Sequence, residues 1–117
     1  MSSRDKVLLM TLIDTIDEIN SFIKKERCTN ISDFKSNTML KRAVTMCLVS
    51  ISEMVDTISD DFKNVHPDIN FKRFKTLRNI AAHKYGAVNF DIIWEIADKN
   101  MPVYRAQFAQ ILEENRF

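Results

Sequence analysis

Along most of the chain, hydrophobic and polar residues alternate with the period of an amphipathic α-helix. Between residues 5 and 25, apolar side chains from Leu8 to Ile23 recur at spacings of one, three and four, and charged residues take most other positions. This pattern predicts a first helix over residues 5–25. Residues 26–35 lose the period and predict a connector with room for one short turn.

A second apolar stripe begins at Leu40 and continues through about six helical turns to Phe62. Ser36 or Asn37 can cap the N-terminus of this predicted helix. Glu53 lies beside the stripe, so the simplest interpretation is a solvated carboxylate. The alternative is that Glu53 pairs with an arginine in a groove.

Two prolines divide the second half of the chain. Pro67 disfavours helical backbone at the residue before it, so a third helix is predicted to start near residues 70–73. Asn89 can cap a fourth helix, and Pro102 either kinks that helix or starts a new segment. The elements predict an all-α fold, an antiparallel four-helix bundle with its last helix kinked or split, forming one domain over residues 1–117.

Composition agrees with a few long helices, because the 117 residues include only one glycine and two prolines. The net charge is +1, so any surface that binds nucleic acid must be local. Cys28 and Cys47 lack metal-ligand spacing and are expected to be reduced thiols. With no secretory leader or membrane-length apolar stretch, a cytoplasmic protein without metal or cofactor is expected.

The residues that carry reactive groups gather in the eight-residue segment from Arg78 to Tyr85, just before the single glycine, Gly86. His83 can take and give a proton near neutral pH, and the planar guanidinium of Arg78 suits a phosphate. Together they suit phosphodiester chemistry without a metal. A histidine at a helix C-terminus is equally explained by its favourable interaction with the helix dipole.

Helical geometry leaves one question open within this segment. Asn79 and His83 are four residues apart and share a side of the helix, whereas Arg78 and His83 project about 140° apart. They can converge through long side chains, through a distorted last turn, or because a second copy of the chain supplies part of the site.

The same region holds the one local concentration of positive charge. No acidic residue occurs between Asp68 and Asp91. The basic residues in this interval are Lys72, Arg73, Lys75, Arg78 and Lys84. They are candidates for RNA contact, and a solvated charged face is the alternative.

The pattern Arg78-Asn79-x3-His83-x-Tyr85 resembles the Arg-x4-His-x-Tyr signature of the HepT-like toxins, a branch of the HEPN superfamily of helical ribonucleases. The residues from Pro67 to Phe71 resemble the family's Pro-x-Ile-Pro-Trp approach to the motif, with Phe71 in place of tryptophan.

Two further stretches carry the resemblance. Ile51-Ser52-Glu53 resembles the family's Ile-Gly-Glu, with Ser52 in place of glycine. Trp94 and Pro102 stand where the last helix of the family has a tryptophan and a proline.

The resemblance implies a homodimer whose two motifs line one cleft and cleave RNA, with transfer RNA as a target, without a metal. His83 would be the general acid and base, Arg78 would stabilise the transition state, and Asn79 and Glu53 would support them. The implied partner is an MntA-type nucleotidyltransferase antitoxin of a type VII toxin–antitoxin pair, which would adenylylate Tyr85. The competing interpretations are a non-catalytic binding or scaffolding subunit of a nucleotidyltransferase and a purely regulatory helical dimer.

Overall fold

The computed structural model describes residues 1–81 and 88–115, apart from the side chains of Thr76, Arg78, Ile80 and Ala81. This part of the chain contains helices and no strand, so the predicted all-α class is confirmed. In chain order the helices are α1 (Ser3–Lys25), α2 (Ile31–Ser36), α3 (Thr38–Thr57), α4 (Asp60–Val65), α5 (Lys72–Ala81), α6 (Phe90–Glu95), the π-helical turn η2 (Ile96–Asn100) and α7 (Met101–Glu114).

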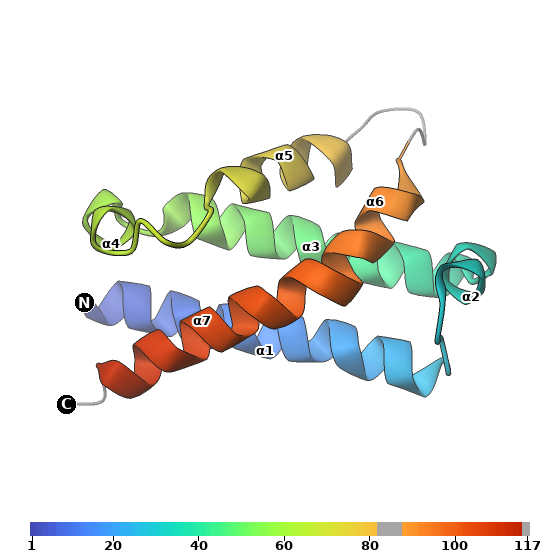
Figure 1. Ribbon diagram of the computed structural model, residues 1–117, viewed down its shortest axis with the longest axis horizontal. Helices are drawn as coiled ribbons and strands as arrows, with labels where there is room; N and C mark the ends of the chain where they lie inside the picture. The colour runs from blue at the N-terminus through green and yellow to red at the C-terminus, as the bar shows by residue number, and fades with distance from the viewer. Residues whose placement is uncertain (82–87, 116–117) are drawn as a thin grey trace.

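The arrangement in space is built on the pair α1 and α3, which lie side by side and run in opposite directions (Figure 1). α5 packs against α3, and α7 crosses α1 at an angle. The N-terminus, the C-terminal end of α7 and α4 lie at one end of the molecule, and α2 and α6 lie toward the other. None of the helices in the described ranges is both long enough and apolar enough to span a membrane.

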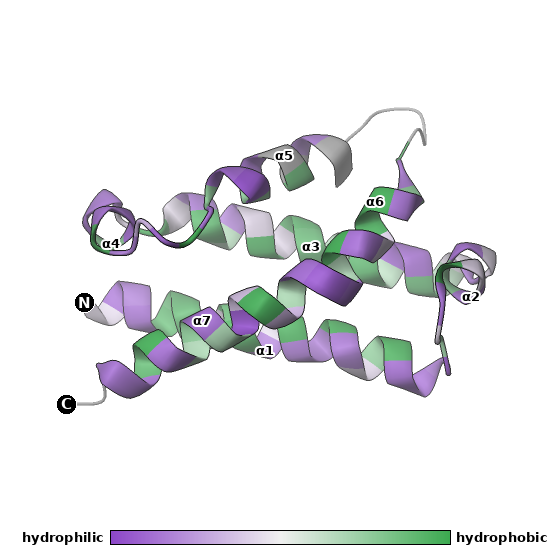
Figure 2. Ribbon diagram, viewed as in Figure 1, coloured by the Kyte–Doolittle hydropathy of each residue, from purple (hydrophilic) through white to green (hydrophobic). Residues whose placement is uncertain are grey.

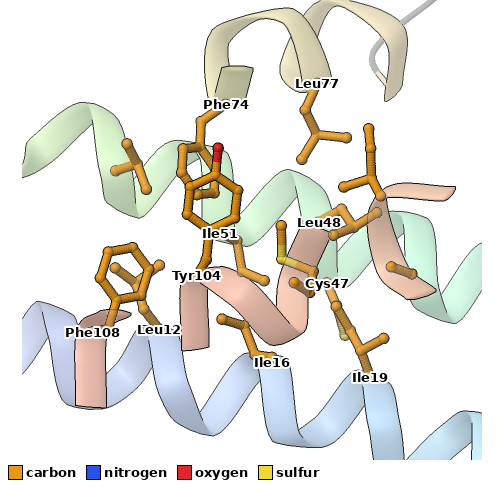
Figure 3. Close-up of a cluster of buried hydrophobic side chains, with 14 of the residues drawn as sticks. Leu12, Ile16, Ile19, Cys47, Leu48, Ile51, Phe74, Leu77, Tyr104 and Phe108 are labelled. Carbon is orange, nitrogen blue, oxygen red and sulfur yellow. The ribbon is translucent and has the colours of Figure 1, made fainter. Parts of the chain in front are cut away.

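One cluster of buried hydrophobic side chains fills the space between these helices (Figure 3). The members labelled there are Leu12, Ile16, Ile19, Cys47, Leu48, Ile51, Phe74, Leu77, Tyr104 and Phe108. Their spacings of three and four within α1, α3, α5 and α7 put them on one side of each helix. Polar and apolar residues accordingly alternate along α1 and α7 (Figure 2).

The helix ends follow local capping rules. The side chain of Asn37, one of the two predicted caps, accepts a hydrogen bond from the Leu40 N–H at 3.0 Å at the start of α3. At the end of α1, Arg27 adopts a left-handed conformation with φ 52°. Its N–H and that of Cys28 donate to carbonyls of the last turn of α1 at 3.0 and 3.1 Å, the pattern of a Schellman motif.

The prediction of one continuous second helix as far as Phe62 is wrong. α3 ends at Thr57, Ile58 is extended with φ −65° and ψ 140°, and α4 begins two residues later. The Ser59 side chain caps α4 by accepting a hydrogen bond from the Phe62 N–H at 3.2 Å. Ile58 and Phe62 are both buried, so the apolar stripe continues across the break even though the helix does not.

A long-range contact stabilises this break. Asp5, at the start of α1, has only 3% of its surface exposed. Its carboxylate accepts hydrogen bonds from the N–H of Ser59 at 3.1 Å and from the Ser59 hydroxyl at 2.6 Å. A residue inside a regular helix donates its N–H to the preceding turn, so this contact requires the backbone to leave the helix at Ser59.

Near Pro102, where a kink or a split was predicted, the structure contains a π-helical turn, and the backbone stays helical from Phe90 to Glu114. The N–H of Met101 donates to the carbonyl of Ile96, five residues back, which is the hydrogen bond of a π-helix. Pro102 has no N–H, so a regular α-helical ladder cannot continue through it, and α7 begins beside it. Asn89 caps α6 as predicted, accepting from the N–H groups of Asp91 and Ile92 at 3.1 and 3.3 Å.

Candidate functional site

The basic helix predicted to lead into the motif is α5. Lys72, Arg73 and Lys75 are exposed on it, and Asn79 is exposed in its last turn. Arg78 lies in the same turn, and its side chain is outside the described part of the structure.

The remaining predicted site residues, His83, Lys84 and Tyr85, lie outside the described residues. The predicted roles of Arg78 and His83 therefore stay predictions. The structure determines how the helix that leads to them is held.

Two buried side chains determine how α5 is rotated. Phe74 and Leu77 point into the core cluster (Figure 3), and the ring centroids of Phe74 and Tyr104 are 4.4 Å apart. Lys72, Lys75 and Asn79 recur at spacings of three, four and seven on the opposite side of the helix. The packing of α5 therefore turns this polar side to solvent.

The N-terminal half of α5 and the residues just before it are also attached to η2 and α7 by hydrogen bonds. An Nη atom of Arg73 donates to the side-chain oxygen of Asn100 at 3.1 Å, and the Tyr104 hydroxyl donates to the backbone oxygen of Asn70 at 2.9 Å. Burial raises the pKa of Tyr104, and the nearby charge of Arg73 offsets part of that rise. The phenol is therefore neutral at physiological pH and keeps its proton for this bond.

The chain after the motif is anchored at the start of α6. The Phe90 ring lies edge-on to Phe34, with centroids 6.4 Å apart, and Lys41 Nζ lies 4.7 Å from the Phe90 centroid. Lys35 and Asp91 form an ion pair at 3.1 Å. The helix before residues 82–87 and the helix after them are thus both attached to the core or its edge.

Beside α5 lies an open groove of about 560 Å³, formed with α6 and η2. Its lining residues are Asn70, Lys72, Arg73, Leu77, Ile92, Glu95 and Ile96. The sequence analysis identified the two cations but missed the residues of α6. No local signal could have found them, because α5 and α6 meet only in the folded chain.

A second hollow, of about 520 Å³, lies at the end of the molecule that holds the N-terminus and the C-terminal end of α7. Asp5, Asp61 and Glu114 contribute to its lining. Carboxylates repel a phosphate backbone, so the groove beside α5 is the better candidate for a nucleic-acid contact.

Three further residues that the sequence singled out, Glu53, Ser52 and Phe71, lie on or near α3 and α5. Glu53 is exposed on α3, and the described side chains contain no arginine paired with it. Ser52 is buried and its hydroxyl donates to the Leu48 carbonyl at 2.7 Å, so the residue that replaces the family's glycine is accommodated within α3. The ring of Phe71 packs edge-on against Phe62, with centroids 6.2 Å apart.

Neither thiol is placed for chemistry. Cys28 and Cys47 are free and buried, and burial raises the pKa of Cys47 to about 11. In the described ranges, no group of three or more His, Cys, Asp or Glu side chains could hold a metal ion.

Comparison with known proteins adds a second line of evidence. The model of the ribonuclease HepT-like family matches residues 12–111 of this chain. A Methanocaldococcus jannaschii protein assigned as RNase MJ1216 is 30% identical over 97% of this chain and 93% of its own length. The assigned RNase MJ0125 of the same organism is also 30% identical, over 97% of each chain.

A protein of Thermococcus cleftensis assigned as ribonuclease HepT is 26% identical over 95% of this chain and 98% of its own. No solved structure gives a significant match. The similarity to these relatives extends over nearly the whole chain and includes the segment from Arg78 to Tyr85.

Proposed function

This chain belongs to the HepT-like ribonuclease family, and from this premise we propose that it is a metal-independent endoribonuclease, the toxin of a type VII toxin–antitoxin pair. The observation that carries the proposal is the family match over residues 12–111, which includes every position from Arg78 to Tyr85. The exposed cations of α5 support it, since an RNA strand needs positive charge along its path.

The proposed reaction is an internal transesterification. His83, as the base, takes the proton of a ribose 2′-OH while the 2′ oxygen forms a bond to the neighbouring phosphorus. The bond from phosphorus to the 5′ oxygen of the next nucleotide breaks, and that oxygen receives a proton from an imidazolium. Arg78 stabilises the negative charge of the phosphorane-like transition state, and the products are a 2′,3′-cyclic phosphate and a 5′-hydroxyl.

We propose that a homodimer completes the site. Arg78 and His83 project about 140° apart on an ideal helix, so residues from two motifs in one cleft can converge where a single helix does not. Asn79, exposed in the last turn of α5, would position Arg78 or the phosphate. Glu53 is exposed on α3, the helix against which α5 packs, and would support the same cleft.

Control by a partner enzyme belongs to the same proposal. A nucleotidyltransferase antitoxin would transfer AMP from ATP to the hydroxyl oxygen of Tyr85, two residues after His83, with pyrophosphate as the leaving group and loss of the phenol proton. The added group is bulky and anionic, so it would exclude an RNA phosphate both by volume and by charge repulsion. The reaction would take place in the cytoplasm, with transfer RNA as the proposed target.

The test is RNA cleavage in the presence of EDTA by the wild type and by the variants His83→Ala, Arg78→Ala and His66→Ala. His66 is the matched control, because it is the other histidine and lies at the end of α4, where its ring is tilted against Phe62 with 4.6 Å between centroids. We expect the wild type and His66→Ala to cleave, and His83→Ala to lose about 100-fold or more of the rate.

Intact mass must first show that Tyr85 carries no AMP, and light scattering must show equal oligomeric states. Cleavage by His83→Ala at the wild-type rate would contradict the assignment of His83. An unmodified dimer that cleaves no RNA would contradict the enzyme and favour the binding or scaffolding subunit.

A further inference from the structure

The groove between α5 and α6 combines an apolar floor with a charged rim. Leu77 and Ile96 are buried and Ile92 is half-buried, so aliphatic side chains form its bottom. Lys72 and Arg73 lie on the α5 side and Glu95 on the α6 side, and all three are exposed. An apolar surface with a few polar groups at its edge is typical of a small-molecule or cofactor site.

The cation at this rim is held in place. One Nη atom of Arg73 donates to Asn100 at 3.1 Å, and Asn100 is the last residue of the π-helical turn next to Pro102. A guanidinium has five N–H donors, so this bond leaves others for a ligand while it restrains the side chain. Glu95 forms no ion pair with any of the described residues, so its carboxylate also keeps its acceptor capacity.

These groups match the parts of one nucleotide. The flat face of a base can lie on the aliphatic floor, and a phosphate can lie against Lys72 and Arg73. The carboxylate of Glu95 repels a phosphate but accepts hydrogen bonds from an exocyclic amino group, as carried by cytosine. The groove volume, about 560 Å³, lies within the range of sites for ligands of this size.

The groove and the first residues of the motif lie along the same helix, α5. Lys72, at its mouth, and Asn79, in the last turn of α5, are both exposed and project within about 20° of each other on an ideal helix. Seven residues of helix advance about 10.5 Å, which corresponds to about three nucleotides of a stacked strand at about 3.4 Å each. A strand lying along this side of α5 would reach both the groove and the segment that begins at Arg78.

We propose that this groove binds one nucleotide of the RNA strand, about three positions along a stacked strand from the nucleotide beside Asn79. Its base lies on Leu77, Ile92 and Ile96, its phosphate contacts Lys72 and Arg73, and Glu95 favours a base that carries an amino group. The inference rests on the proposed ribonuclease function for its substrate. It goes beyond that function in assigning a base-binding site to residues of α6.

The experiment measures binding of labelled oligocytidylate and oligouridylate of equal length by fluorescence anisotropy, with His83→Ala in every protein so that the RNA stays intact. Ile92→Trp fills the groove, and Val7→Trp adds the same bulk at a 62% exposed position on α1. We expect Ile92→Trp, whose indole would take up the groove volume that the base needs, to weaken binding about tenfold, and Val7→Trp to leave it unchanged. Glu95→Ala should abolish the preference for cytosine over uracil, whereas Glu18→Ala, an exposed carboxylate on α1, should keep it.

Circular dichroism and thermal melting establish that each variant is folded. If Ile92→Trp is unfolded at the assay temperature, Lys72→Glu takes its place, because Lys72 is exposed and its replacement disturbs no core contact. Wild-type affinity in the folded groove variant, or no RNA binding at all, would overturn the proposal. If Ile92→Trp binds RNA more weakly but Glu95→Ala still prefers oligocytidylate to oligouridylate, the role of Glu95 is wrong.

Cleavage by the same set of proteins with His83 restored separates this inference from the proposed function. Normal cleavage by every groove variant would leave the ribonuclease proposal standing and refute the base-binding site. Binding that depends on Ile92 and Glu95, without cleavage by the wild type, would support the site and refute the enzyme.

Discussion

Asp5 offers the most direct test of the contacts that shape this fold. Its carboxylate is 3% exposed and accepts two hydrogen bonds from Ser59, at 3.1 Å from the N–H and at 2.6 Å from the hydroxyl. The substitution Asp5→Asn keeps the side-chain shape, removes the charge, and turns an amide donor toward the donors of Ser59. One of the two bonds is then lost, and the other loses its charged acceptor.

The expected cost follows from these contacts. Hydrogen bonds to a charged group contribute about 1.5–3 kcal/mol each. Losing one bond and weakening the other should therefore lower the free energy of unfolding by about 2–4 kcal/mol. For a domain of this size, about 4 °C of melting temperature corresponds to 1 kcal/mol, so the midpoint should fall by about 10 °C.

The dependence on pH has a definite sign. Burial by itself raises the pKa of Asp5, but the hydrogen bonds from the Ser59 hydroxyl and N–H, with that of Ser2 and the charge of Arg4, outweigh it and lower the pKa. A lowered folded-state pKa means that the unfolded chain binds the proton more readily. This contribution is present above about pH 4, the pKa of an unfolded aspartate, and is lost as pH falls through the lower folded value.

The assay is urea unfolding followed by circular dichroism at neutral pH and at several acidic values. Asp14→Asn is the matched control, because Asp14 is exposed on the same helix. A double-mutant cycle with Ser59→Ala should show coupling of about 1 kcal/mol or more between the two positions. If Asp5→Asn and Asp14→Asn unfold at the same urea concentration, the contact is not a source of stability and the account of the break at Ile58 is wrong.

Three further outcomes are expected. Arg27→Gly should raise the free energy of unfolding by about 0.5–1 kcal/mol. Glycine relieves left-handed strain of about 1–2 kcal/mol at this position, and the greater flexibility that it gives the unfolded chain offsets part of that gain. A decrease in the free energy of unfolding, measured in urea, would contradict this. Cys47, 8% exposed with a pKa of about 11, should resist alkylation at pH 8 until the protein unfolds, and rapid labelling of the native protein would refute its burial. Lys75→Ala should weaken binding of all RNA sequences alike, and the slope of the logarithm of the binding constant against the logarithm of salt concentration should become less steep by about 0.7, the value for one phosphate contact. Lys25→Ala, at an exposed position on α1, is the control and should change neither quantity.

The sequence by itself determined the elements whose causes are local. The spacing of apolar residues predicted α1, Pro67 predicted the break before α5, and Pro102 predicted an irregularity where the structure has a π-helical turn. Asn89 was identified as a cap, and Asn37 as one of two candidates with Ser36, because a short polar side chain can bond the free N–H groups of a helix start. The concentration of reactive groups from Arg78 to Tyr85 was likewise visible in the sequence, as was the resemblance to the family.

Only the tertiary structure decided where distant segments meet. The stripe from Leu40 to Phe62 predicted one helix, because periodicity records which residues face the core and does not record whether the backbone stays helical. The break depends on Asp5, which is 54 residues from Ser59 and reaches it only when α1 lies along α3. The run Ser59-Asp60-Asp61, a cap followed by acidic residues in a first turn, was its one local signal.

The groove beside α5 arises in the same way. Its cations follow one another in the sequence, but Ile92 and Glu95 line the same groove only because the folded chain places α6 beside α5. The bond between Arg73 and Asn100 spans 27 residues and depends on the π-helical turn next to Pro102. Side-chain chemistry and helical period belong to the sequence, whereas the grouping of side chains into a binding surface depends on packing between helices, which no local pattern contains.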